Sequence, residues 1–250
     1  MKSLILTGAS GGIGSQIAKS AQKSDYKVGL IDIDEEKIEA LSKEIPNSIP
    51  LSADITSEES VLKALDVFGE IPDSLVNCAG IVRYGRLVDQ SVEDFKRVLE
   101  VNLLGTFIVC RSVAKLMIKK QSGNIVNICS ISGGKHPAIN TGGYAASKSG
   151  VAMLSEQMSL EFGKEGIRVN SVSPGFINSG MSAPHYAEKD EMNKREEMVP
   201  LGRIGSADDI SRVVLFLLSD ESSYIHGENI IVDGGVMNSV LANISRKKEK

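Results

Sequence analysis

The sequence has few cysteines, and this shortage excludes two kinds of site. Only three are present among 250 residues, Cys78, Cys110 and Cys129. They are too few and too far apart for a disulfide framework or a zinc site, so we expect no bound metal. All three stand in apolar stretches, which indicates buried free thiols in a reducing compartment. We therefore expect a cytoplasmic protein.

Long apolar runs and an excess of positive charge are also missing. The longest unbroken apolar run, 213–218, is too short to span a bilayer. The first 14 residues lack the apolar core and cleavage site of a secretory signal. Lysine and arginine number 28 against 32 acidic residues, a net charge of −4, which argues against a general nucleic-acid binder. The one basic cluster, 246–248, is typical of a solvated tail.

Short β-branched runs alternate along the chain with longer amphipathic runs, as in a series of βαβ units. No repeat, low-complexity stretch or linker interrupts the series. We predict one α/β domain over 1–235, a doubly wound and mostly parallel sheet of about seven strands with helices on both faces, and a tail over 236–250. Strands are expected at 4–7, 27–32, 49–52, 74–77, 124–129, 167–172 and 229–232, and helices at 13–24, 34–44, 57–68, 92–118 (one or two helices), 143–162 and 207–218.

A glycine-rich turn follows the first predicted strand and opens the first predicted helix. It reads TGASGGIG, from Thr7 to Gly14. Glycine permits the tight turn and a close approach of the backbone to a pyrophosphate, to which the helix N-terminus offers N–H groups. Asp32 ends the second predicted strand, where a carboxylate accepts hydrogen bonds from adenosine ribose hydroxyls. Together these features favour a dinucleotide site over an empty turn and a surface aspartate.

Tyr144 and Lys148 lie four residues apart in a predicted helix, and therefore on one face of it. A free tyrosine has a pKa of about 10, and an adjacent ammonium lowers it by stabilising the phenolate. Such a pair can exchange a proton with a carbonyl or alcohol oxygen while a hydride moves to or from a nicotinamide. A Tyr and a Lys that merely share an exposed helix face show the same spacing, so the pair alone does not establish catalysis.

Eight motifs in one order resemble those of the short-chain dehydrogenases/reductases, over essentially all of 3–235. The glycine turn resembles the family's TGxxxGxG, and the segment NCAG at 77–80 resembles its NNAG. Similarity is strongest to members that resemble bacterial 3-oxoacyl-carrier-protein reductases. The remaining motifs are Asp54 with Ile55 (the adenine edge), Asn102, Ser130, Tyr144 with Lys148, Pro174-Gly175, and the terminal DGG at 233–235.

The resemblance implies a Rossmann-type fold and a catalytic tetrad. Ser130 would bind the substrate oxygen, and Tyr144 would be the acid/base. Lys148 would lower the tyrosine pKa and bind the nicotinamide ribose, and Asn102 would hold its helix and a water that links Lys148 to solvent. The loop 132–143 is expected to carry an insertion, which makes Ser132 the rival catalytic serine. The expected coenzyme-binding residues are Gly8, Ser10, Gly11, Gly12, Ile13, Gly14, Asp32, Asp54, Ile55, Asn77, Ala79, Gly80, Tyr144, Lys148, Pro174, Gly175 and Ile177.

The residues around Asp32 favour NAD over NADP. Relatives that use NADP usually carry Arg or Lys in the glycine turn or just after the second strand, and here Gly11 and Ile33 stand at those places. The Asp32 carboxylate would also repel a 2′-phosphate. We expect NAD(H) as the coenzyme, with NADP as the alternative.

The sequence leaves the substrate open. The segment 178–200 is expected to form a lid, in which Met181 and Tyr186 supply an apolar wall or pack the lid onto the body, and the charged run 188–197 is expected to face solvent. We predict hydride transfer between NAD(H) and a secondary alcohol or ketone, such as a hydroxy acid, polyol, sugar or 3-hydroxyacyl group. The alternatives are an NADPH-dependent 3-oxoacyl-carrier-protein reductase of fatty acid synthesis and a non-catalytic cofactor-binding regulator, which the presence of Tyr144 and Lys148 disfavours.

Apart from this small-molecule substrate, the expected partner is the chain itself. Apolar stripes along 102–118 and 143–162 exceed what one face of a sheet needs, and in the family the matching helices pack across a twofold axis. We therefore expect a homotetramer or a homodimer, and neither a nucleic-acid nor a membrane partner.

Overall fold

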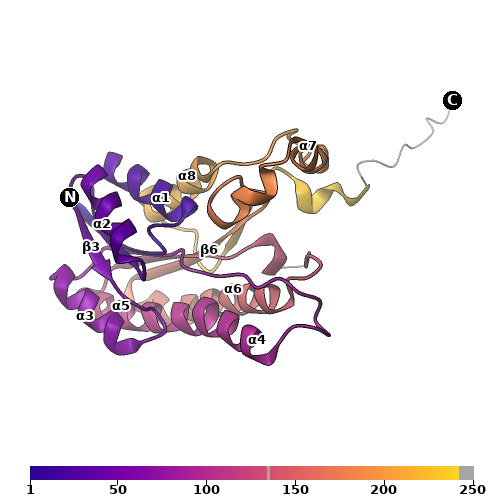
Figure 1. Ribbon diagram of the computed structural model, residues 1–250. Helices are drawn as coiled ribbons and strands as arrows, with labels where there is room; N and C mark the ends of the chain where they lie inside the picture. Colours follow the sequence, from indigo (N-terminus) through magenta and orange to yellow (C-terminus); the bar gives the residue numbers. More distant parts are fainter. Residues whose placement is uncertain (134–135, 242–250) are drawn as a thin grey trace.

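A parallel sheet of seven strands lies between two layers of helices (Figure 1). The computed structural model describes residues 1–133 and 136–241. The strand order is β3-β2-β1-β4-β5-β6-β7, so the direction of winding reverses between β1 and β4. The predicted doubly wound parallel sheet is therefore confirmed. The strands are β1 Lys2–Thr7, β2 Tyr26–Asp32, β3 Ser48–Ser52, β4 Ser74–Asn77, β5 Gly123–Ile128, β6 Ile167–Pro174 and β7 Asn229–Val232.

Helices connect the strands and cover both faces of the sheet. α1, α2 and α8 form one layer, and α3 to α6 form the other (Figure 1). Each predicted helix is present, with outer boundaries that differ from the prediction by at most two residues. The helices are α1 Gly12–Lys23, α2 Glu35–Glu44, α3 Glu58–Phe68, α4 Val92–Leu99, α5 Thr106–Lys120, α6 Gly142–Phe162, α7 Lys189–Met198 and α8 Ala207–Leu218.

The two faces of the sheet carry separate apolar cores. Along β1, Leu4 and Leu6 pack in the cluster that includes α1, α2 and α8, whereas Ile5 packs in the cluster that includes α3 and α5. All three side chains are fully buried. Because both faces are covered, the strands are apolar at successive positions rather than at alternate ones. Because both faces of the sheet are buried, only the ends of its strands are open to a ligand.

The stretch predicted as one or two helices over 92–118 is continuous but changes its winding. A turn of π-helix, Glu100–Gly105, joins α4 to α5. By length and composition the whole helix Val92–Lys120 passes the test for a membrane span, with a mean hydropathy of 1.6 in its most apolar window, of which 56% is buried inside the protein. Asn102 and Thr106 interrupt its apolar residues, so a search for unbroken apolar runs misses it.

The segment expected to form a lid, 178–200, contains two short helical pieces. Gly180–Tyr186 forms a 3₁₀-helix and α7 follows it. None of the α7 side chains is fully buried, in agreement with a largely solvated face. Part of the expected tail, Val236–Leu241, is a 3₁₀-helix. The rest of that tail, with its basic cluster, lies outside the described residues.

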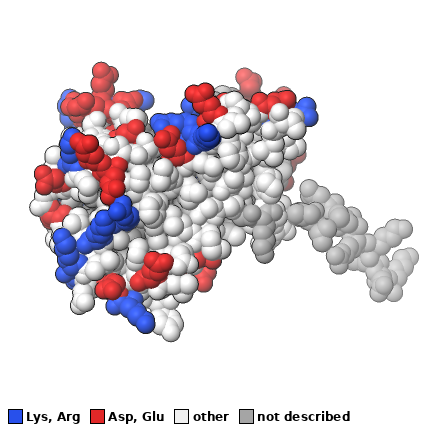
Figure 2. Space-filling view, turned by 90° about the horizontal axis from the view of Figure 1, so that it is seen from below, with Lys and Arg blue, Asp and Glu red and all other residues white. Residues whose placement is uncertain are grey.

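One broad surface carries few charges. Figure 2 views the layer of α4 to α6 and shows a wide area without charged side chains, with lysines, arginines and acidic residues gathered toward its rim. Large apolar side chains are exposed on these helices, among them Leu104, Phe107, Met153 and Leu160. Exposed apolar patches of this kind mark interaction surfaces when they are contiguous. The predicted oligomer stays a prediction, and this surface is where we place its contact.

Candidate active site

The expected site residues meet in one cleft at the carboxyl ends of the strands. The cleft has a volume of about 590 Å³. Its position, on both sides of the point where the winding reverses, is where ligands bind in open α/β sheets. Two expected residues, Asn77 and Asn102, are buried beneath the cleft rather than lining it. The expected residues that line it are Gly8, Ser10, Gly11, Gly12, Ile13, Gly14, Asp32, Asp54, Ile55, Ala79, Gly80, Ser130, Tyr144, Lys148, Pro174, Gly175 and Ile177.

The glycine turn between β1 and α1 has the geometry of a phosphate cradle. Gly8 has a φ of +64°, and a Cβ on Gly14 would lie 2.1 Å from the Gly8 carbonyl oxygen, so neither position admits a side chain. No side chain caps the first turn of α1, and no acidic residue stands in it. By contrast, Asp34 and Ser57 cap α2 and α3. The N–H groups at the start of α1 therefore suit a pyrophosphate, which would supply the missing cap.

The glycine turn touches the beginning of the lid segment, residues 178–200. A Cβ on Gly12 would lie 2.1 Å from Ser179 Oγ and 2.3 Å from the Gly180 nitrogen. Only a glycine lets these two backbones come so close. The part of the cleft expected to bind phosphate and the part expected to bind substrate are therefore in direct contact.

Asp32 is fixed at the end of β2 by the glycine turn itself. Its Oδ2 accepts hydrogen bonds from the Ser10 backbone N–H (3.1 Å) and from Ser10 Oγ (2.7 Å). Its Oδ1 accepts a weaker one from the Asp34 N–H (3.3 Å). Among the described residues that line the cleft, no Lys or Arg stands at this end beside Asp32, since Gly11 and Ile33 occupy the two diagnostic places. The two neutral hydroxyl groups of a ribose therefore suit this carboxylate better than a negatively charged phosphate does.

The expected adenine-edge residues also lie at this end. Asp54 Oδ1 accepts hydrogen bonds from the Thr56 N–H (2.9 Å) and from Thr56 Oγ1 (2.7 Å), so a local turn holds the carboxylate. Ile55 is nearly buried, and its side chain fills the space that a Cβ on Gly105 would need. In the described part of the chain two carboxylates line the cleft, Asp32 at the end of β2 and Asp54 just after the neighbouring strand β3.

Asn77 acts from beneath the cleft, within a buried polar network. Its Nδ2 donates to Asn127 Oδ1 (2.8 Å), and Asn127 Nδ2 donates to Ser155 Oγ on α6 (2.9 Å). On the other side, Thr7 Oγ1 accepts from the N–H groups of Cys78 and Ala79. The network ties β4, β5 and α6 together under the site. Since Cys78 contributes here through its backbone N–H, cysteine at this position keeps the contact.

Asn102 lies in the π turn and links two parts of the site. Its Oδ1 accepts from the Ile81 N–H (2.8 Å), and its Nδ2 donates to the Ile81 carbonyl (2.9 Å) and to Ser147 Oγ (2.9 Å). Ser147 immediately precedes Lys148 on α6. A π turn leaves backbone carbonyls without their usual partners, and Thr106 Oγ1 donates to the Asn102 carbonyl (2.7 Å). Asn102 therefore holds the loop after β4 and positions α6.

Tyr144 and Ser130 face each other across the cleft. Burial raises the pKa of Tyr144, and its hydrogen bond with the Ser130 side chain opposes that rise. Ser132, the rival serine, instead donates its backbone N–H to Ser130 Oγ (3.1 Å). Both serines line the cleft, but the contact with the tyrosine belongs to Ser130. The geometry thus favours Ser130 as the partner of Tyr144. Part of the loop expected to carry the insertion, Gly134 and Lys135, lies outside the described residues.

Lys148 lies near the ring of Tyr144. Its Nζ is 5.9 Å from the centre of the Tyr144 ring and donates to the Ile128 carbonyl (2.7 Å). Burial lowers the pKa of Lys148, because a buried ammonium loses its hydration. We expected this ammonium to lower the pKa of Tyr144. In the protein without bound coenzyme, the pKa of Tyr144 is instead raised. Desolvation is the largest influence on the tyrosine pKa, and the influence that opposes it is the hydrogen bond with Ser130.

The lid and the loop after β4 add residues that the sequence did not single out. Tyr84 and Arg195 line the cleft, together with Met181 and Tyr186, which were expected there. Tyr84 stands in a segment without regular structure, and Arg195 belongs to the charged run that was interpreted as solvated. No local spacing marks either residue. Their signal is spatial and comes only from the fold.

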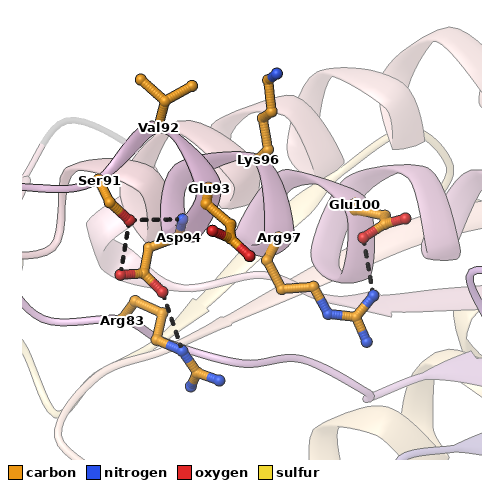
Figure 3. A pocket seen from close by; sticks show the side chains of 8 residues that line it. All are labelled: Arg83, Ser91, Val92, Glu93, Asp94, Lys96, Arg97 and Glu100. Carbon is orange, nitrogen blue, oxygen red and sulfur yellow. Dashed lines mark hydrogen bonds and ion pairs between the residues drawn. The ribbon is translucent and has the colours of Figure 1, made fainter.

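A second hollow lies beside the cleft, over the start of α4. Figure 3 shows its charged side chains, in which Arg83 pairs with Asp94 and Arg97 pairs with Glu100. These four of the six charged side chains that line the hollow form two ion pairs, and all four are well exposed. Exposed pairs of this kind contribute little to stability. None of the expected site residues lines this hollow.

Comparisons with known proteins agree with the geometry. The family model described as Enoyl-(Acyl carrier protein) reductase matches residues 8–237. Carbonyl reductase family member 4 of Xenopus tropicalis is 41% identical over 235 residues, covering 92% of this chain and 95% of that protein. The 3-oxoacyl-[acyl-carrier-protein] reductase FabG of Thermotoga maritima is 38% identical over 248 residues, covering 94% and 98%. The crystal structure of a 3-oxoacyl-[acyl-carrier protein] reductase from Brucella melitensis superposes with a TM-score of 0.89 at 28% identity, covering 94% of this chain and 91% of that one.

Proposed function

Because the chain belongs to the short-chain dehydrogenase/reductase family, we propose that it is an NAD(H)-dependent oxidoreductase that interconverts a small secondary alcohol and its ketone. Membership makes it an oxidoreductase with a nicotinamide coenzyme. The choice of NAD, the kind of substrate and a cytoplasmic location are our proposal. The observation that carries the coenzyme choice is the Asp32 carboxylate, held by Ser10 at the end of β2.

The described residues fit such a coenzyme along the whole cleft. The uncapped first turn of α1 suits the pyrophosphate, and Asp32 and Asp54 suit the adenosine end. The end of the cleft that we assign to the nicotinamide includes Lys148, Gly175 and Ile177 among its lining residues. When bound, the coenzyme supplies or accepts a hydride at its nicotinamide ring.

The protein's own groups handle the proton and the charge on oxygen. In the direction of ketone reduction, the Tyr144 hydroxyl donates its proton to the substrate oxygen. In the direction of alcohol oxidation, the Tyr144 phenolate accepts the hydroxyl proton. Ser130 Oγ donates a hydrogen bond to the same oxygen and stabilises the charge that develops there. Asn102 holds α6 and the loop after β4, so that the tyrosine and the serine converge on one point.

Asp32 selects against the 2′-phosphate of NADP by charge. That phosphate adds roughly −2 charge, and at about 4 Å with an effective dielectric near 20 each like-charge pair costs on the order of 4 kcal/mol before screening. A screened remainder of roughly 1.4–2.8 kcal/mol corresponds to a tenfold to hundredfold preference for NAD. The same carboxylate accepts hydrogen bonds from the two ribose hydroxyls of NAD.

A second candidate comes from the names of the relatives. Carbonyl reductase family member 4 and FabG are both named as reductases, and this favours reduction of a 3-oxoacyl group with NADPH. Asp32 disfavours that candidate through its charge, while the catalytic groups serve either reaction. A regulator without turnover is disfavoured, because the chain has all four residues of the expected tetrad. Three of them line one cleft, Ser130, Tyr144 and Lys148, and Asn102 is buried beneath it.

The test is the coenzyme preference of the wild type and of Asp32→Ala. We expect wild-type kcat/KM to favour NAD over NADP by about tenfold to hundredfold. In Asp32→Ala the NAD value falls, because the ribose hydrogen bonds are lost, and the NADP value rises or holds. Asp34→Asn is the matched control. It removes the same charge at a position two residues after Asp32, and the Asp34 side chain does not line the cleft. A wild type that prefers NADP would overturn the coenzyme assignment and favour the second candidate.

A further inference from the structure

We infer that Ser149 of α6, which lies outside the sequence motifs, is a positioning residue that sets the direction of the Ser130 hydroxyl through the turn after β5. This inference rests on the proposed function, in which Ser130 binds the substrate oxygen, and adds a residue to it. Ser149 does not line the cleft, so it acts through Ser130 and touches neither substrate nor coenzyme. Its role is therefore separate from that of the expected tetrad.

The turn after β5 orients the Ser130 hydroxyl from within. Ile131–Gly133 forms a 3₁₀-helix, and the Gly133 N–H donates to the Ser130 carbonyl (3.0 Å). The Ser132 N–H donates to Ser130 Oγ (3.1 Å). A serine hydroxyl has one proton and two acceptor sites, so this contact occupies an acceptor site and leaves the proton to donate toward Tyr144 or the substrate oxygen. The direction of the hydroxyl therefore depends on the position of the turn.

Helix α6 holds the turn at very short range. A Cβ on Gly133 would lie 2.5 Å from Lys148 Cβ and 2.8 Å from the Ser149 nitrogen, so only a glycine lets the two backbones come so close. Ser149 Oγ donates to the Gly133 carbonyl at 2.6 Å. The turn thus lies directly on the helix that carries Tyr144, and a displacement of the turn would move Ser130 relative to the tyrosine.

Two consecutive residues of α6 hold the chain on either side of Ser130. Lys148 Nζ donates to the carbonyl of Ile128 (2.7 Å), which precedes Ser130 by two residues. Ser149 Oγ donates to the carbonyl of Gly133, which follows Ser130 by three. The Lys148 ammonium is also expected to bind the nicotinamide ribose, whereas Ser149 lies outside the cleft. The Ser149 contact therefore serves the turn alone.

The alternative is an ordinary helix serine that only satisfies its own hydroxyl. Ser149 Oγ also lies 2.9 Å from the Ala145 carbonyl, four residues earlier, and serines in helices often make this contact. One hydroxyl proton cannot serve both acceptors fully, and the Gly133 carbonyl is the nearer of the two. Without the contact to Gly133, alanine would be the better residue for this helix position. The effect of Ser149→Ala on catalysis separates the two roles.

The test is a double-mutant cycle on Ser130 and Ser149, with NADH-dependent reduction of methyl 3-oxobutanoate as the probe reaction. Ser149→Ala should lower kcat by about 5- to 20-fold and leave the KM for NADH within about twofold, because a misdirected hydroxyl stabilises the transition state less. Ser149→Thr keeps a hydroxyl and should stay within about threefold of wild type. In the Ser130→Ala background, Ser149→Ala should cost less than about twofold, because the group through which it acts is gone.

A second measurement needs neither coenzyme nor substrate. The ionisation of Tyr144 is followed by phenolate absorbance, as the difference between each protein and its Tyr144→Phe counterpart. Because the hydrogen bond with Ser130 lowers the pKa of Tyr144, Ser149→Ala should move this ionisation to higher pH. In the Ser130→Ala background it should cause no further change.

Ser219→Ala is the matched control. It removes a serine hydroxyl that donates to the Phe216 carbonyl of α8 (2.8 Å), at a position that does not line the cleft. It should leave both measurements unchanged.

Four results would overturn the inference: a kcat of Ser149→Ala within about twofold of wild type, an unchanged ionisation of Tyr144 in that variant, an equal loss in the Ser130→Ala background, or no recovery in Ser149→Thr. Absence of any turnover by the wild type would count against the proposed function itself. The absorbance measurement still tests the position of Ser130 in that case, so the two failures are distinguishable.

Discussion

The proton on Tyr144 is subject to two opposing influences. Burial raises the pKa of the phenol, and the hydrogen bond from Ser130 lowers it. Alcohol oxidation needs the phenolate, so its rate should rise with pH until the tyrosine is fully ionised. Ketone reduction needs the neutral phenol and should fall over the same range. The pH dependence of the two directions is therefore opposite in sign.

At the scale of single residues, we predict the effect of Ser130→Ala. The variant removes the influence that lowers the pKa, so the rise of oxidation rate should move to higher pH, and kcat/KM should fall by about 10²- to 10³-fold through loss of an oxygen-binding donor. Ser132→Ala should change neither, because its side chain makes no described contact with Tyr144. The measurement is kcat/KM for oxidation as a function of pH in the three proteins. A shift produced by Ser132→Ala alone would make Ser132 the catalytic serine.

At the scale of the element, the clearest local device is the start of α8. Ser206 Oγ accepts from the Asp209 N–H, and Asp209 Oδ2 accepts from the Ser206 N–H (2.7 Å), so the two residues form a capping box. Arg203 adds two hydrogen bonds to the same carboxylate, 2.9 Å and 2.8 Å long. These contacts, the one from Arg203 foremost, hold the pKa of Asp209 well below its usual range.

Asp209→Asn should therefore destabilise the protein in a pH-dependent way. A depressed carboxyl pKa stabilises the fold above the unfolded pKa of 3.8, and that contribution disappears as pH falls toward the folded pKa. We expect the variant to lose about 1 kcal/mol of unfolding free energy near neutral pH, with a difference from wild type that narrows below about pH 4. Urea unfolding at several pH values measures this. Glu59→Gln, in an exposed pair with Lys63, should remain close to wild type throughout, and a pH-independent difference for Asp209→Asn would contradict the ionic account.

The secondary-structure elements differ in how well the sequence predicted them. Strands and helices were predictable because both faces of the sheet are buried, which leaves apolar runs and regular spacing. The glycine turn and Asp32 were predictable because they follow strands directly. The π turn at Asn102 was not, since its residues are ordinary helix residues and the side chain of Asn102 finds its partner, Ile81, only in the folded chain. Arg195 was missed because a charged helix looks solvated until the fold places one of its residues over a cleft.

The pKa direction of Tyr144 was missed for a related reason. The spacing of Tyr144 and Lys148 gives their shared face and says nothing of how deeply that face is buried. In the folded chain Lys148 Nζ donates to the Ile128 carbonyl, and desolvation dominates both groups. Proximity in sequence predicted the neighbours correctly, whereas the balance between charge and burial depends on the whole packed domain.

On the scale of the whole molecule, the sparsely charged face of α4 to α6 should be covered in solution. Light scattering at micromolar concentration should return a dimer or tetramer of the 26.8 kDa chain. Phe107→Lys with Leu160→Lys places two charges on that face and should shift the mass toward the monomer, because a buried unpaired charge is costly. Val67→Lys, at an exposed apolar residue of α3, is the control and should leave the mass unchanged. A monomeric wild type would refute the prediction.

The parallel arrangement of the strands has a practical consequence. All seven strands run in the same direction, so their carboxyl ends lie on the edge of the sheet that carries the cleft and their amino ends lie on the opposite edge. β1 starts at Lys2, and Met1 before it is 69% exposed on that edge. A fused reporter, a purification handle or a covalent tether joined ahead of Met1 would thus leave the molecule from the side farthest from the reacting groups. Immobilised in this way on an electrode or a bead, the protein would present its open cleft to the solution.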